Sequence, residues 1–173
     1  IIEDCIIKNF LGAAIDFESS TAGAQLFVSN TTLVDNLGGG ILIKPSGGRA
    51  RASIAGVRAF GNKFGVRNED GADVAISNTV VSGSTENAFQ AVSTSTPTNM
   101  NLRADVVSNN GLSGISSEGS NTIVTFSDLT AVGNSGQPTA SVGGGVWPAL
   151  GTNPFTPSPN ALPPPPPTAG PRA

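Results

Sequence analysis

The stretch Val74-Ala75-Ile76-Ser77-Asn78-Thr79-Val80-Val81-Ser82-Gly83 contains the pattern that decides the fold. Two short runs with apolar residues at alternate positions flank a Ser-Asn pair, and this alternation predicts two β-strands joined by a tight turn. Related segments span Leu26–Asn36 and Ile123–Asn134. We therefore expect one strand-turn-strand unit to repeat along the chain.

An asparagine that follows the second strand defines the period of this repeat. It recurs every 22 to 27 residues, and a serine replaces it once, at Asn9, Asn36, Asn62, Ser84, Asn110 and Asn134. A period near 25 residues with small insertions is typical of stacked coils. We interpret the five asparagines as a structural ladder, in which each side-chain amide bonds to the next coil and satisfies backbone groups at a bend. A row of ligand-binding amides is the other interpretation.

Apolar residues line up when the chain is aligned on this asparagine. Eight positions before it stand Ile1, Val28, Ile54, Ile76, Leu102 and Phe126. Three positions before it stand Ile6, Leu33, Ala59, Val81, Val107 and Ala131, and about five positions after it stand Ile15, Ile41, Val66, Phe89 and Ile115. The residues six positions before it are mostly turn formers, which predict a corner between two strands. They are Glu3, Asn30, Gly56, Asn78, Ala104 and Asp128. These columns predict an all-β parallel β-solenoid of about six coils over residues 1–142, with a continuous apolar interior.

The pattern resembles the right-handed parallel β-helix proteins, the fold of pectate lyases and polygalacturonases. The Val74–Gly83 stretch and its two relatives carry this resemblance. It implies the fold and its right-handed coil, and it says little about activity.

The composition changes after Val142. Gly143-Gly144-Gly145 is followed by a segment rich in proline, which includes Pro163–Pro167. Proline cannot donate to a strand ladder, so we expect the solenoid to end here and residues 143–173 to form a tail, which the proline run extends. We expect either a linker or a cap and assembly arm, in which Trp147 and Phe155 pack on the last coil or on a neighbouring molecule.

The charge and the amino-acid composition exclude several classes of function. Only 12% of the residues are charged, the net charge is −3, and there is no run of Lys or Arg, so nucleic-acid binding is not expected. Nor is membrane insertion, because no apolar stretch is long enough to span a bilayer. The chain has one cysteine, Cys5, and no histidine, which removes the commonest general base and metal ligand. Since the chain begins inside a repeat, we expect a mature fragment, an excised domain or the visible part of a larger protein.

Weak candidates for catalysis lie after the Ile15 to Ile115 column. One residue later, an expected exposed column contains Asp16, Leu42, Arg67, Gln90 and Ser116, and three residues later Glu18, Lys44 and Glu69 alternate in charge. Arg67 with Asp16, Glu69, Asp70 and Asp73 would be a calcium-plus-base lyase site, although such clusters are usually solvated faces. No other cofactor is expected. Asp70 and Asp73 are more simply turn residues around Gly71.

The signatures of the enzymes with this fold are missing. Polygalacturonases carry a Gly-His-Gly motif and paired aspartates, pectate lyases a Trp-Ile-Asp-His-like stretch, and alginate epimerases a His and a Tyr. This chain has neither His nor Tyr, no adjacent aspartates, and its single Trp is in the tail. The resemblance therefore extends to the fold and not to these active sites.

We accordingly predict a non-catalytic solenoid outside the cell or on a bacterial cell surface, acting as a structural, adhesive or filament-forming unit. Its expected partners are copies of itself, through stacked coils or a docked tail, and polysaccharide. The alternatives are a secreted polysaccharide lyase or hydrolase and a carbohydrate-binding module. A broad incubation with polymers would separate these classes.

Overall fold

Three parallel six-stranded sheets build the protein in its computed structural model, which describes residues 1–145. Sheet A consists of β1 (Ile2–Glu3), β4 (Gln25–Ser29), β7 (Ala50–Ala55), β10 (Ala72–Ser77), β13 (Thr98–Arg103) and β16 (Thr122–Ser127). Sheet B consists of β2 (Ile6–Lys8), β5 (Thr32–Val34), β8 (Arg58–Phe60), β11 (Val80–Ser82), β14 (Val106–Ser108) and β17 (Thr130–Val132). Sheet C consists of β3 (Ala13–Phe17), β6 (Gly39–Ile43), β9 (Val66–Asn68), β12 (Phe89–Val92), β15 (Ile115–Glu118) and β18 (Thr139–Val142).

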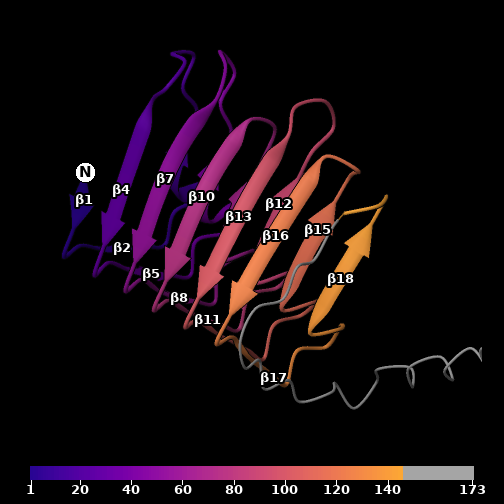
Figure 1. Cartoon of the computed structure of the whole chain (residues 1–173). Coiled ribbons are helices and arrows are strands. Elements are labelled where there is room, and N and C mark those ends of the chain that lie inside the picture. The colour runs from indigo at the N-terminus through magenta and orange to yellow at the C-terminus, as the bar shows by residue number, and fades with distance from the viewer. Residues whose placement is uncertain (146–173) are drawn as a thin grey trace, which may run out of the picture.

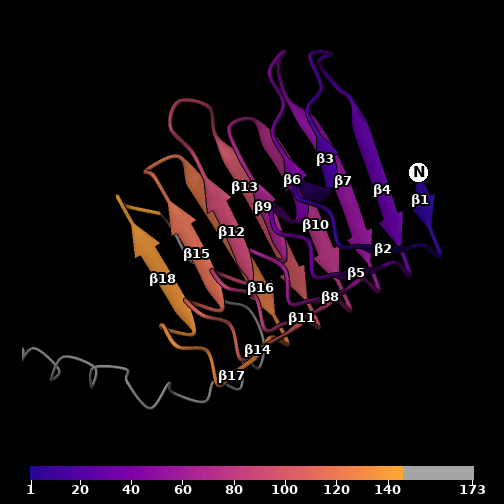
Figure 2. The ribbon, with the colours of Figure 1, turned by 180° about the vertical axis from the view of Figure 1, so that it is seen from behind.

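Each coil contributes one strand to each sheet, so the chain makes about five turns between β1 and β16 and completes the sixth set of strands at β18. Sheets A and C form the two broad faces, and the short strands of sheet B close one edge between them (Figure 1). The view from behind shows the strands of sheet C running opposite to those of sheet A (Figure 2). The prediction of an all-β parallel β-solenoid is thus confirmed. Among residues 1–145 there is no helix with the length and apolarity to cross a bilayer.

The interior is the stack of equivalent apolar side chains that the repeat predicts. Ile15 pairs with Ile41, Ile41 with Val66, Val66 with Phe89, and Phe89 with Ile115. All five side chains are buried, as are their counterparts in sheet A from Val28 to Phe126. Each Å² of apolar surface that is buried stabilises the fold by about 25 cal/mol, so these two columns are the main source of stability.

In the first coil the predicted register is wrong by one residue. Ile2, not Ile1, pairs with Val28, and Ile7, not Ile6, pairs with Leu33. Ile1 and Ile6 are accordingly 87% and 74% exposed. The cause is Asn9, which lies one position before the ladder column, so aligning the chain on it shifted the residues that precede it by one position, whereas Ile15 after it pairs with Ile41 as predicted.

The corner between sheets A and B is a single residue with positive φ. Asn30, Asn78 and Asp128 have φ near 50°, and Gly56 has φ of 65°. Asp4 takes this position in the first coil, where Glu3 was predicted. Ala104 completes the column at φ 56°, a conformation that costs an alanine about 1 kcal/mol or more. The column of turn formers thus marks one residue per coil in the left-handed backbone conformation, at which the chain turns sharply from sheet A into sheet B.

Candidate functional site

The ladder asparagines lie at the corner between sheets B and C, inside the molecule. The Nδ2 group of Asn36 donates to Oδ1 of Asn62 at 2.8 Å, and the backbone N–H of Asn36 donates to the same oxygen at 3.0 Å. Asn62 in turn donates to the carbonyl of Leu33 at 2.9 Å. Both asparagine side chains are fully buried. Each amide therefore joins two coils and satisfies backbone groups that the bend leaves without strand partners.

The same arrangement joins Asn110 and Asn134, with an Nδ2 to Oδ1 distance of 2.8 Å. Between the two pairs stands Ser84, whose backbone N–H donates to Oδ1 of Asn110 but whose buried hydroxyl has no hydrogen-bond partner. In the first coil the ladder position is occupied by Phe10 and not by Asn9, since the backbone N–H of Phe10 donates to Oδ1 of Asn36. Asn9 is exposed and has φ 62°, so the structure separates it from the other four.

The predicted column on sheet C has the predicted register, but its last two residues, Gln90 and Ser116, are buried. Leu42 pairs with Arg67, Arg67 with Gln90, and Gln90 with Ser116. Gln90 is 6% and Ser116 is 3% exposed, which corrects the expectation of an open surface here. Their polar groups are directed at one carboxylate, because Gln90 Nε2 and Ser116 Oγ donate to Oε1 of Glu118 at 2.6 and 2.9 Å. The sequence places Glu118 in the same column as Glu18, Lys44 and Glu69, but it did not predict that Glu118 accepts these two hydrogen bonds, because Gln90, which links it to the charged residues, carries no charge.

The charged residues of this face also form ion pairs with one another. Nε of Arg67 lies 2.6 Å from Oε1 of Glu69, and Nζ of Lys44 lies 3.6 Å from Oε2 of the same carboxylate. Arg67 also contacts Oε1 of Gln90 at 3.4 Å. A continuous network therefore runs over four coils from Lys44 to Glu118, and it uses the two carboxylates of Glu69 and Glu118 as its acceptors.

Asp70 lies in the loop between sheets C and A and binds the loop of the next coil. Its Oδ1 accepts the backbone N–H groups of Thr94, Ser95 and Thr96 at 2.8 to 3.0 Å, and its Oδ2 accepts the Thr94 hydroxyl. Burial opposes ionisation, but these hydrogen bonds outweigh it and lower the pKa of Asp70 to about 2. The carboxylate holds the 93–97 loop in place through four hydrogen bonds, three to Oδ1 and one to Oδ2.

Asp73 lies on sheet A, on the face opposite to Arg67. It forms an ion pair with Arg49 and accepts a 2.7 Å hydrogen bond from Nδ2 of Asn99. Burial raises its pKa, yet the hydrogen bonds from Arg49 and Asn99 and the charges of Arg49 and Arg51 leave it below the ordinary value. The five candidates are thus not one site: Asp16 and Arg67 lie on sheet C two coils apart, Glu69 directly follows β9, Asp70 lies in a loop, and Asp73 lies on sheet A.

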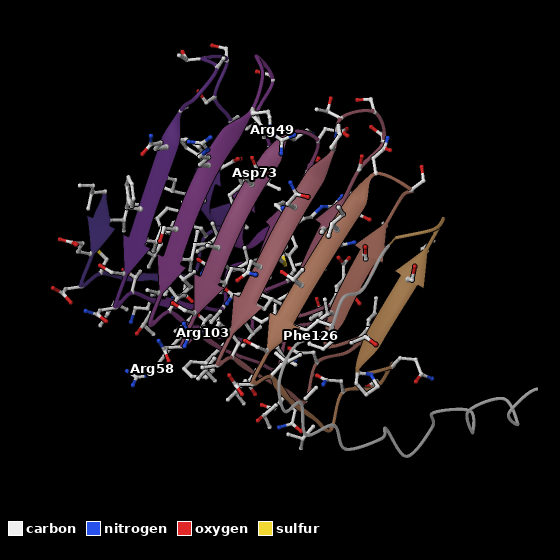
Figure 3. All side chains as sticks on the ribbon, viewed as in Figure 1. Arg49, Arg58, Asp73, Arg103 and Phe126 are labelled. Carbon is white, nitrogen blue, oxygen red and sulfur yellow. The ribbon has the colours of Figure 1, made fainter. Side chains whose placement is uncertain are left out.

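The outer face of sheet A contains a feature that the sequence analysis missed. A hollow of about 480 Å³ lies over β7, β10, β13 and β16, and its rim includes Arg51, Asp73, Asn101, Ile123 and Thr125. Arg49 and Asp73 lie together at one end of the strands of this sheet, whereas Arg103 lies at the other end (Figure 3). Ala75, one of the residues that line the hollow, projects only a methyl group, whereas Arg51, Asp73 and Asn101 around it have longer side chains. The alternation pattern shows that Ala75 faces outward, but a strand sequence alone does not show the depth that its neighbours create.

Asp105 is the one carboxyl of residues 1–145 whose side chain is fully buried. It follows the corner residue Ala104, and its two oxygens accept the N–H groups of Thr79 and Arg103 at 2.8 and 2.9 Å. Burial raises its pKa to about 7, because these two hydrogen bonds do not offset the loss of water. Thr31 and Thr79 occupy the equivalent position, directly after the corner residue, in two other coils. Asp105 is therefore a structural residue of the corner between sheets A and B.

Within residues 1–145, no three Asp, Glu, Cys or His side chains come together as a set that could hold a metal ion. No curated protein and no solved structure matches the chain. The family model described as right handed beta helix region matches residues 1–160. With the parallel coils and inward columns described above, this match shows that the chain belongs to the right-handed beta helix family.

Trp147 and Phe155, predicted to cap the solenoid or to mediate assembly, lie outside the described residues. Of the strands within residues 1–145, β18 is the last, and it ends at Val142.

Proposed function

We propose that this chain is a non-catalytic β-solenoid that acts outside the cell or on the cell surface as a structural and adhesive unit, with extended polysaccharide as its partner. The family is functionally broad, so the proposal depends on the chemistry of the two broad faces.

The observation that carries the proposal is the pairing of the carboxylates. A hydrolase with two catalytic carboxyls needs them free to face the scissile bond on opposite sides. Here Glu69 is bound by Arg67 and Lys44, Glu118 by Gln90 and Ser116, and Asp70 by its neighbouring loop. Releasing Glu118 for proton transfer would leave the buried Gln90 and Ser116 without this acceptor, which costs about 1–3 kcal/mol per buried group. These groups are therefore suited to holding coils together.

The polar but weakly charged surface supports an adhesive role. The outward residues of sheet A are mostly Ser, Ala, Asn and Thr, which offer hydroxyl and amide groups at the regular spacing of the strands. A rigid scaffold presents such groups without the entropic cost of ordering flexible loops, and preorganisation of this kind improves binding.

The test combines turnover and binding on one preparation. Purified protein is incubated with pectin, alginate and other acidic and neutral polymers, with and without calcium, and the products are assayed for new reducing ends and unsaturated uronates. We expect no products, together with retention of the protein on at least one immobilised polymer. Product formation would contradict the non-catalytic assignment, and absence of retention on every polymer would contradict the adhesive one.

Self-association through stacked coils is a separate part of the proposal. Light scattering at increasing protein concentration measures it directly. A mass that stays at one chain would limit the protein to an adhesive role without filament formation.

A further inference from the structure

The outer face of sheet A has two columns of outward side chains with different properties. The first column runs through Gln25, Arg51, Asp73, Asn99 and Ile123, and the second through Phe27, Ser53, Ala75, Asn101 and Thr125. In the second column two small residues, Ser53 and Ala75, separate Phe27 from the longer Asn101 and Thr125. The column is therefore low in the middle, where the hollow lies, and has an aromatic ring at one end that is 46% exposed.

The charge on this face is positive, although the whole chain has a net charge of −3. Arg49 forms an ion pair with Asp73, and the charge of Arg51 also stabilises the ionised Asp73 without forming an ion pair with it. Arg51, on the rim of the hollow, is exposed and forms no ion pair within residues 1–145, and Arg103 at the far end of the same sheet forms none either. An unpaired guanidinium binds a carboxylate or sulfate through two parallel hydrogen bonds. The face thus complements an anion.

The uncharged rim groups are held in fixed positions. Nδ2 of Asn101 donates to Oγ1 of Thr125 at 2.6 Å, and Nδ2 of Asn99 donates to Asp73. Each amide keeps its oxygen and a second N–H for a ligand, since an amide has two donors and one acceptor group. Hydroxyl-rich molecules need donors and acceptors close together, and the apolar faces of their rings pack on aromatic side chains such as Phe27.

The repeat distance favours a polymer over a small molecule. Adjacent strands lie about 4.8 Å apart, which is close to the length of one sugar ring in an extended glycan. A glycan parallel to the solenoid axis therefore meets an equivalent outward position at each successive sugar.

We propose that the outer face of sheet A binds an extended acidic glycan, whose carboxylate or sulfate group contacts Arg51 while its rings occupy the hollow over Ala75 and pack against Phe27. This inference rests on the proposed adhesive function and adds the face and the ligand class to it.

The experiment measures the dissociation constants of the whole chain for alginate, heparin, neutral dextran and single-stranded DNA. Alginate carries carboxylates and heparin carries sulfates as well, so the two separate the sources of the anion. Two variants change the face in different ways: Arg51→Gln removes the cation, and Ala75→Trp fills the hollow without changing the charge. Arg58→Gln is the matched control, because Arg58 is exposed, forms no ion pair in the described part of the chain, and lies on sheet B away from the hollow (Figure 3). Thermal unfolding verifies that each variant is folded.

We expect an acidic glycan to bind the original chain and the Arg58→Gln control equally well. Arg51→Gln and Ala75→Trp should each weaken binding about tenfold or more, as expected for a lost charge-assisted contact. Unchanged affinity in both variants would overturn the assignment of this face while leaving the adhesive function intact. Absence of binding to every glycan would remove the adhesive function as well, and equal binding to dextran, or tighter binding to DNA, would overturn the acidic-glycan class.

Discussion

Two of the three bends in each coil, those between sheets A and B and between sheets B and C, solve the same problem with different chemistry. Both leave backbone N–H groups without strand partners, and both recruit a buried side chain from the next coil to accept them. The corner between sheets B and C uses neutral amides such as Asn62, which accept and donate at once. At the corner between sheets A and B, the Thr31 hydroxyl oxygen accepts the N–H of Cys5 at 3.5 Å, and the carboxyl of Asp105 accepts the N–H of Thr79 at 2.8 Å. A neutral group that both donates and accepts makes a corner independent of pH, whereas a buried acid does not.

The largest effect is expected from breaking the amide corner at Asn62. Asn62→Ala removes the acceptor for two N–H groups of Asn36 and the donor to Leu33, all in the buried interior. Loss of three buried hydrogen bonds and some packing should lower the free energy of unfolding by about 3 kcal/mol. Chemical denaturation measures it. The exposed Asn121→Ala is the control and should change stability little; an equal loss in both variants would show that the ladder contributes nothing of its own.

The second effect distinguishes the two corners by their response to pH. The pKa of Asp105 is raised from 3.8 to about 7 in the folded chain. Between these values the folded protein keeps a proton that the unfolded chain releases, so stability falls as pH rises through this window and becomes level above it. Asp105→Thr places at this corner the residue that Thr31 and Thr79 already provide. It should abolish the decline and raise the free energy of unfolding at pH 8 by about 2 kcal/mol.

Unfolding measured from pH 4 to pH 8 tests this expectation. Asp16→Thr, which removes an exposed carboxylate from β3, provides the control and should keep the decline. If Asp105→Thr keeps it as well, the buried carboxyl is not its source.

The backbone at the A–B corner gives a smaller and opposite effect. Ala104 has φ 56° where Asn30 and Asn78 occupy the same position of their coils. Asparagine tolerates this left-handed conformation better than alanine, so Ala104→Asn should raise the free energy of unfolding by about 1 kcal/mol. Denaturant midpoints measure the gain. Ala55→Asn, one strand position earlier in its own coil, has no positive φ to relieve and should not stabilise the protein.

The same two corners show how far the sequence predicts the structure. Apolar alternation predicted the inward columns from Val28 to Phe126 and from Ile15 to Ile115, because only one register buries every member. It failed in the first coil because asparagine suits both the left-handed position before the ladder and the ladder itself, and Asn109-Asn110 occupies the two side by side. The hollow over Ala75 was not predicted, since depth depends on the lengths of side chains from four different coils. Nor was the Glu118 acceptor, which neutral Gln90 connects to the charged residues.

The smallest effect tests whether the amide corner is complete. Ser84 stands where the other coils have Asn62 and Asn110, and its buried hydroxyl has no partner. Ser84→Asn would place an amide oxygen toward the coil of Asn62 and an amide N–H₂ toward Asn110, joining the two separate pairs into one ladder. Since a satisfied buried hydrogen bond contributes about 1 kcal/mol and the larger side chain must be accommodated, we expect a gain of about 0.5 kcal/mol in the free energy of unfolding. Ser84→Ala removes the unpaired hydroxyl without adding an amide and separates the two causes. A gain from Ser84→Ala as large as that from Ser84→Asn would mean that relief of the unpaired hydroxyl, and not continuity of the ladder, stabilises this corner.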